Sequence, residues 1–216
     1  MAFTNLKLYG RPLSSATRRA AVILIEKKVP FEFVLVPNRE HKAPEYLKKH
    51  PFGQIPLIEE PDGFRLYESR AIGRYIAEKY ASQGTPLLPT ELKAKAIFEQ
   101  AASSELANFD FLASQAVKEV IGKKREGLTP DYDRFNEIYS ELSAKLDAYE
   151  IILSKQKYIA GDEITLVDLF HIPFGSSLVT IVPDVFEKRP NVSRWWNDIS
   201  SRPSWQSVKE GVHSTA

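Results

Sequence analysis

The stretch HPFGQIPLI, residues 50–58, decides the fold together with FRLYESRAI, residues 64–72. The first stretch predicts a tight turn and a short strand, and EEPDG at residues 59–63 has the composition of a hairpin turn. The second predicts another short strand that leads into a helix. Apolar residues then recur at helical spacing: Ile72, Tyr75, Ile76 and Tyr80. The region therefore predicts an antiparallel hairpin followed by a helix.

Two features of this region point to peptide binding. If the Ile55–Pro56 bond is cis, the chain reverses there and the backbone N–H and C=O of Ile55 face outward beside Gln54, free to pair with an extended peptide. The alternative is a strand edge blunted by proline, and the local sequence leaves both open. Glu68 and Ser69 fall where the helix begins, and the unpaired N–H groups and partial positive charge of a helix N-terminus suit a small carboxylate.

Composition bounds the class of protein. The chain has 216 residues, 43% apolar and 26% charged, which suits an ordinary globular protein of one large or two small domains. The net charge of +1 gives no indication of nucleic acid or an anionic membrane as a partner. The absence of cysteine excludes disulfides, thiolate metal sites and cysteine nucleophiles, and we expect no metal and no permanently bound cofactor.

The sequence also suggests a location. Residues Met1–Leu6 lack a basic segment followed by an apolar one, so we expect no signal peptide. No apolar run approaches the roughly 20 residues that span a bilayer. A cytoplasmic location is expected.

The chain order predicts two domains. A strand at residues 4–9, a helix introduced by SSAT at residues 14–17 and ending near Lys28, and a strand near residues 31–36 form a parallel βαβ unit with a right-handed crossover. With the hairpin and its helix, this is a thioredoxin-like layout over residues 1–81. Residues 82–89 are a linker by composition. Residues 90–216 show no strand pattern and predict an all-helical domain.

The helical domain carries one clear local signal. Thr165 and Asp168 have the spacing of a capping box, with Asp in place of the usual Glu. We interpret Asp168 as a folding residue and not as a catalytic one. Trp195, Trp196 and Trp205 are interpreted as packing anchors.

Several motifs together resemble a family. These are GRPLSSATRR at residues 10–19, EHK at 40–42, PFGQIP at 51–56, ESRAI at 68–72 and the segment Ile164–Pro173. Over nearly the whole chain, the sequence resembles a cytosolic glutathione transferase, most closely of the phi class. The resemblance implies a thioredoxin-like domain plus an all-helical domain, glutathione as co-substrate and a homodimer.

The resemblance assigns the catalytic role to Ser14, as a hydrogen-bond donor that stabilises the thiolate of glutathione. Ser15 and Thr17 are rivals in the same turn, and a plain N-cap is the alternative role for Ser14. Arg18 is interpreted either as a source of positive potential or as a solvated helix-face charge.

The resemblance also assigns the glutathione-binding residues. Ser69 takes the γ-glutamyl carboxylate and Glu68 the γ-glutamyl ammonium, while the Ile55 backbone, before Pro56, pairs with the cysteinyl unit. His41, Lys42 and Gln54 reach the glycyl end. Arg70 is either an ion-pair member across a dimer or a helix-face charge.

A hydrophobic pocket for the second substrate is expected from an apolar set: Leu13, Leu35, Phe109, Leu112 and Leu178. Phe52 is a candidate anchor for a partner subunit. The expected function is conjugation of glutathione to hydrophobic electrophiles, with reduction of organic hydroperoxides as a further reaction open to a serine enzyme. The alternatives are a non-catalytic carrier of apolar ligands and a regulatory protein that reuses the fold.

Overall fold

The computed structural model describes residues 5–216, which form two compact units. The first comprises residues 5–88 and Arg202–Ala216, and the second comprises Pro89–Ser201. Residues 1–4 hold the start of the first predicted strand and most of the segment that bears on a signal peptide, so those expectations lie outside the described residues. Within the described part of the chain, no helix has both the length and the apolar character needed to cross a membrane.

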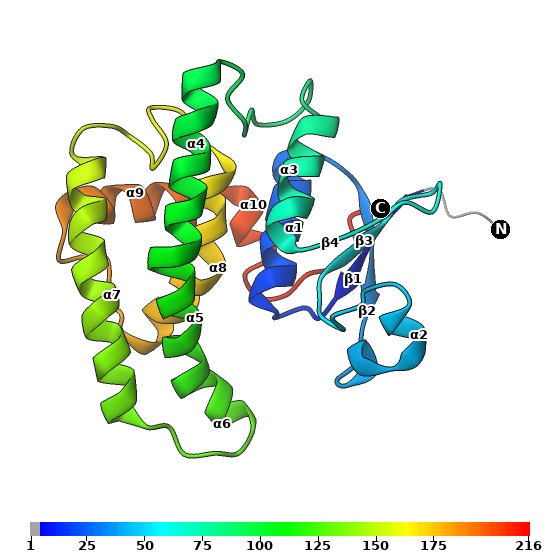
Figure 1. The fold of residues 1–216 in the computed structure, drawn as a ribbon, viewed down its shortest axis with the longest axis horizontal. Helices are drawn as coiled ribbons and strands as arrows, with labels where there is room; N and C mark the ends of the chain where they lie inside the picture. The colour runs from blue at the N-terminus through cyan, green and yellow to red at the C-terminus, as the bar shows by residue number, and fades with distance from the viewer. Residues whose placement is uncertain (1–4) are drawn as a thin grey trace. The chain divides into compact units, whose positions relative to one another are not determined.

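The first unit is a four-stranded sheet with helices (Figure 1). Its elements in chain order are β1 (Leu6–Gly10), α1 (Ser15–Glu26), β2 (Phe31–Leu35), the 3-10 turn η1 (Glu40–Lys42), α2 (Pro44–Leu47), β3 (Leu57–Glu59), β4 (Arg65–Tyr67), α3 (Ser69–Lys79) and α10 (Pro203–Gln206). The sheet order is β2-β1-β3-β4, with β1 parallel to β2 and the other pairs antiparallel. The predicted thioredoxin-like order is confirmed.

Helices α1 and α3 pack against each other, as Figure 1 shows. Helix α1 buries most of its length, including the apolar run from Ala20 to Leu24. It also buries Arg18, Arg19 and Glu26, whose charges need partners inside the unit.

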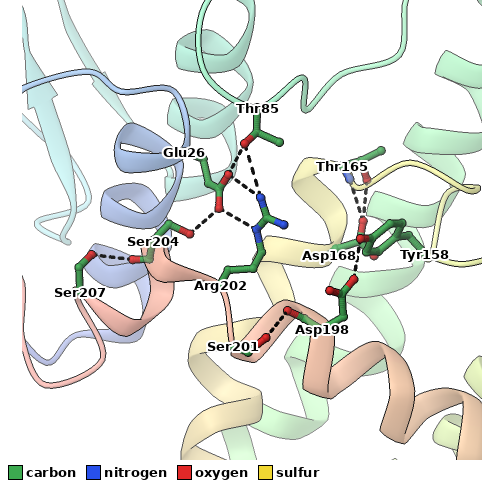
Figure 2. A network of polar contacts seen from close by, with 10 residues as sticks. All are labelled: Glu26, Thr85, Tyr158, Thr165, Asp168, Asp198, Ser201, Arg202, Ser204 and Ser207. Atoms are coloured by element: carbon green, nitrogen blue, oxygen red, sulfur yellow. Dashed lines mark hydrogen bonds and ion pairs between the residues drawn. The ribbon is translucent and has the colours of Figure 1, made fainter.

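The predicted boundary of the helical domain is wrong at its C-terminal end, because Arg202–Ala216 belongs to the first unit. Figure 2 shows the cause: the buried Glu26 carboxylate is paired with the Arg202 guanidinium at 2.7 and 2.8 Å and accepts hydrogen bonds from Ser204 and Thr85. Burial alone would raise the pKa of Glu26, but these partners outweigh it and hold the pKa below its ordinary value.

The second unit is all-helical, as predicted. Its elements are α4 (Leu92–Ser104), the π-helical η2 (Glu105–Asp110), α5 (Phe111–Val117), the π-helical η3 (Lys118–Gly122), α6 (Lys123–Arg125), α7 (Tyr132–Leu153), α8 (Leu166–Ile181) and α9 (Pro190–Ser200). The first five form one uninterrupted helical run.

The capping box at the start of α8 is confirmed. The Asp168 carboxylate is completely buried and accepts hydrogen bonds from the N–H groups of Thr165 (2.9 Å) and Ile159 (3.0 Å) and from Trp195 Nε1 (2.9 Å). Figure 2 shows its pairing with Thr165. One side chain therefore joins the helix cap, the preceding loop and α9.

Candidate functional site

The strand register brings three candidate segments to one end of the sheet. Tyr9 of β1 lies opposite Leu57 of β3, and Leu57 lies opposite Tyr67 of β4. The turn at residues 10–14, the approach to β3 at 54–56 and the start of α3 at 68–70 all adjoin this row. Segments separated by about 55 positions in the sequence therefore meet at the same end of the sheet.

Ser14 is the N-cap of α1 and is half-buried. Its Oγ accepts only a long hydrogen bond, 3.4 Å, from the N–H of Thr17. Within residues 5–216, no group accepts the Ser14 hydroxyl proton. Gly10 lets the helix approach β1 closely, since a Cβ there would lie 2.5 Å from the Thr17 side chain. The hydroxyl can thus donate to an anion at the N-terminus of a 12-residue helix.

The two rivals of Ser14 differ in exposure. Thr17 is completely buried, and its hydroxyl oxygen has no partner in the described part of the chain. Ser15 is half-buried and begins the helix proper. Burial therefore disfavours Thr17 as a ligand donor, while Ser15 stays a rival.

The Ile55–Pro56 peptide bond is cis. Among the residues described, the backbone N–H and C=O of Ile55 form no hydrogen bond, and the C=O of the preceding Gln54 accepts one from the Tyr46 hydroxyl at 2.9 Å. The free pair on Ile55 favours the peptide-binding interpretation over the blunted strand edge.

Glu68 and Ser69 sit at the junction of β4 and α3. Glu68 has φ +69°, a strained conformation for a residue other than glycine, and its side chain is exposed. Ser69 is 6% exposed, and its Oγ accepts a hydrogen bond of 3.1 Å from Arg19 Nη1. The Ser69 proton can therefore be donated to a carboxylate beside the positive charge of Arg19.

Arg19 is a site residue that the sequence did not reveal. It lies in a helical segment dominated by apolar residues, and its partner is 50 positions away. The only available signal was a charged residue beside the apolar run of this helix.

The turn with His41 and Lys42 packs against the turn before β3. Lys42 Nζ donates to the Phe52 carbonyl at 3.0 Å. Gly53 has φ +56°, and a Cβ on it would lie 2.6 Å from the His41 carbonyl oxygen, so both the conformation and the contact favour glycine. This packing places His41 and Lys42 beside the exposed Gln54.

His41 has an open hydrogen-bonding position. Its Nδ1 is buried, and no group in residues 5–216 bonds to it. Burial, with the nearby charges of Arg11 and Lys42, lowers the pKa of His41 below its ordinary value. A buried ring nitrogen without a partner is costly, and a ligand that bonds to it would remove that cost.

Other expectations need correction. Phe109, Leu112 and Leu178 are at most 3% exposed, so they are core residues and not lining residues of an open pocket. Leu13 and Leu35 are 47% and 57% exposed and stay candidates. The interpretation of Arg18 as a solvated helix-face charge was wrong, because this residue is buried with its guanidinium against the C-terminal segment.

Comparisons with known proteins agree with this layout. Residues 8–85 match the family model of the glutathione S-transferase N-terminal domain, and residues 109–203 match that of the C-terminal domain. Glutathione S-transferase PM239X14 of Arabidopsis thaliana is 43% identical over 199 residues, which cover 89% of this chain and 90% of the relative.

Solved structures agree as well. Glutathione transferase F7 from Populus trichocarpa superposes with a TM-score of 0.91 at 40% identity, covering 95% of this chain and 98% of the other. Glutathione S-transferase I from maize, solved in complex with an atrazine glutathione conjugate, has a TM-score of 0.88 at 32% identity, with 95% and 97% covered. The chain therefore belongs to the glutathione S-transferase family, and its relatives place it in the phi class.

Proposed function

We propose that this protein stabilises the thiolate of glutathione and transfers it to hydrophobic electrophiles, with Ser14 as the hydrogen-bond donor to sulfur. The proposal rests on the Ser14 hydroxyl at the N-terminus of α1, which donates no hydrogen bond to any group within residues 5–216. The maize relative, whose structure contains a glutathione conjugate, supports the reaction class.

Ser14 and the N-terminus of α1 can together supply the free energy needed to stabilise the thiolate. A free thiol has a pKa near ~8.5, and only the thiolate is a strong nucleophile. Lowering the pKa by about 2 units needs roughly 3 kcal/mol in favour of the thiolate. A hydrogen bond to a charged group contributes about 1.5–3 kcal/mol, and a partly buried helix N-terminus adds up to ~2 kcal/mol.

The proposed reaction keeps Ser14 protonated. The thiol releases its proton to solvent and the sulfur attacks the electrophilic carbon. In a substitution the leaving group departs with the bonding electron pair. In an addition the π electron pair of the attacked double bond moves away from that carbon and takes up a proton from solvent. Ser14 donates to the sulfur and forms no covalent bond. Leu13 and Leu35, both exposed, are proposed to contact the electrophile.

The peptide of glutathione is proposed to lie along the three adjoining segments. Ser69, backed by Arg19, binds the γ-glutamyl carboxylate, and Glu68 accepts from the ammonium group. The free backbone pair of Ile55 binds the cysteinyl unit. The glycyl end reaches a polar group of three residues, namely His41, Lys42 and Gln54.

Replacing Ser69 with alanine tests this binding mode. Loss of one hydrogen bond to a carboxylate is expected to raise the KM for glutathione roughly 10-fold, with a smaller change in kcat, because the bond is present in both ground and transition states. Steady-state kinetics with glutathione and an activated aryl chloride measure both constants. Ser82→Ala, in the exposed linker, is the control. An unchanged KM in Ser69→Ala would contradict the assignment.

We further propose a cytoplasmic homodimer. Phe52 is 65% exposed, and its ring rests edge-on against His50 and Tyr67, which holds it in place. The second unit has a pocket of about 240 Å³ between α4 and α7 whose lining includes the exposed Ile97 and Ile151. An aromatic anchor on one protomer can pack against the aliphatic side chains that line part of this pocket on its partner. Sedimentation equilibrium is expected to give the mass of two chains, and the mass of a single chain would contradict the dimer.

A further inference from the structure

A buried arginine joins α1 to the C-terminal segment. Arg18, one turn after Ser14, is only 8% exposed. Its Nη1 donates to the Lys209 carbonyl at 2.9 Å, and its guanidinium lies 5.3 Å from the centre of the Trp205 ring. Burial of a guanidinium is unfavourable unless it is bonded, so these contacts fix where the 205–209 region sits on α1.

The same segment also contacts the turn on the other side of Ser14. The Val212 N–H donates to the Pro12 carbonyl at 3.2 Å, and Val208 and Val212 are buried. Gly211, with φ +146°, turns the chain at this point, and a Cβ on it would lie 3.5 Å from Pro12. The segment thus contacts residues 12 and 18, two positions before Ser14 and four after it.

The turn has little internal support. The Ser14 backbone N–H donates to the Arg11 carbonyl at 3.1 Å, and within residues 5–216 the only hydrogen bond to the Ser14 side chain is the 3.4 Å contact from the Thr17 N–H. Downstream, the Arg18 N–H bonds to the Ser14 carbonyl at 2.9 Å. A shift of Arg18 would therefore be transmitted directly to the backbone of Ser14.

We propose that Arg18 is a positioning residue for thiolate stabilisation: with Trp205, Lys209 and Val212 it clamps the turn so that the Ser14 hydroxyl and the first N–H groups of α1 point at the sulfur. This inference rests on the proposed function of Ser14. It differs from a direct electrostatic role, because the guanidinium is engaged by the C-terminal segment and need not touch glutathione.

The test compares Arg18→Gln, Arg18→Lys and the control Ser214→Ala. The control removes the Ser214 hydroxyl, which lies in the same C-terminal segment and accepts a hydrogen bond of 2.8 Å from the Phe33 N–H of β2. For each variant, the thiolate absorbance of bound glutathione is titrated, and kcat and KM are measured. We expect Arg18→Gln to raise the midpoint by roughly 0.5–1 pH unit and to lower kcat roughly 5- to 10-fold, because small displacements of a catalytic group are costly. The control is expected to match wild type.

Arg18→Lys is expected to give an intermediate midpoint. Lysine keeps the positive charge, but its ammonium group cannot both lie on Trp205 and reproduce the donor geometry of the planar guanidinium. It also carries the test if Arg18→Gln does not fold. If Arg18→Gln folds and has the wild-type midpoint, the positioning role alone is overturned. If Arg18→Gln does not fold, a wild-type midpoint in Arg18→Lys overturns that role. A midpoint for wild type equal to that of free glutathione would overturn the Ser14 function and the clamp together.

Discussion

Replacing Asp168 with alanine is expected to lower the free energy of unfolding by about 3–5 kcal/mol, since three buried N–H donors lose their acceptor and each stranded donor costs about 1–3 kcal/mol. The donors are the N–H groups of Thr165 and Ile159 and Nε1 of Trp195. Part of the loss is that of the helix cap itself, about 0.5–2 kcal/mol. Urea unfolding at fixed protein concentration measures the change.

Asp162→Ala is the matched control, because Asp162 is an exposed aspartate in the loop before α8 and accepts one hydrogen bond of 3.1 Å from the Lys157 N–H. Its removal is expected to cost less than about 1 kcal/mol. Equal losses for the two variants would show that the buried network of Asp168 is not the source of its effect.

Replacing Ser14 with alanine is expected to lower kcat roughly 10- to 100-fold, which corresponds to the about 1.5–3 kcal/mol of a hydrogen bond to a charged group. The KM for glutathione should change less, because the peptide contacts lie elsewhere. Steady-state kinetics with glutathione and an activated aryl chloride provide the measurement. A carrier of apolar ligands would show no comparable loss in its ligand affinity.

Ser15→Ala is the control for this prediction, because Ser15 is the adjacent hydroxyl and is also half-buried. It is expected to stay within about twofold of wild type. If Ser15→Ala carried the loss and Ser14→Ala did not, the donor role would move to Ser15.

The order of helices and strands in the first unit follows from the local pattern of apolar and turn residues in the sequence. The apolar residues near Leu57 and Ile58, the turn residues after them and the helical spacing after Glu68 determined the hairpin and α3. The register then follows, since antiparallel strands joined by a short turn have few alternatives. The sequence therefore predicted the fold, and with it the segments that meet at the candidate site.

The buried charges could not be predicted in the same way. Arg18, Arg19 and Glu26 bond to residues 191, 50 and 176 positions away, and such partners leave no local signal. For this reason the sequence assigned Arg202–Ala216 to the wrong unit. Likewise, apolarity alone does not separate an exposed residue such as Leu35 from a core residue such as Leu178.

The most direct test of the catalytic role of Ser14 is the thiolate absorbance of enzyme-bound glutathione as a function of pH, in wild type and in Ser14→Ala. A free thiol has a pKa of ~8.5, and we predict that the midpoint of glutathione bound to the wild type lies about 2 units lower. In Ser14→Ala we predict a midpoint roughly 1–2 units above that of the wild type. The same lowered midpoint in both proteins, or a wild-type midpoint equal to that of free glutathione, would contradict the role of Ser14.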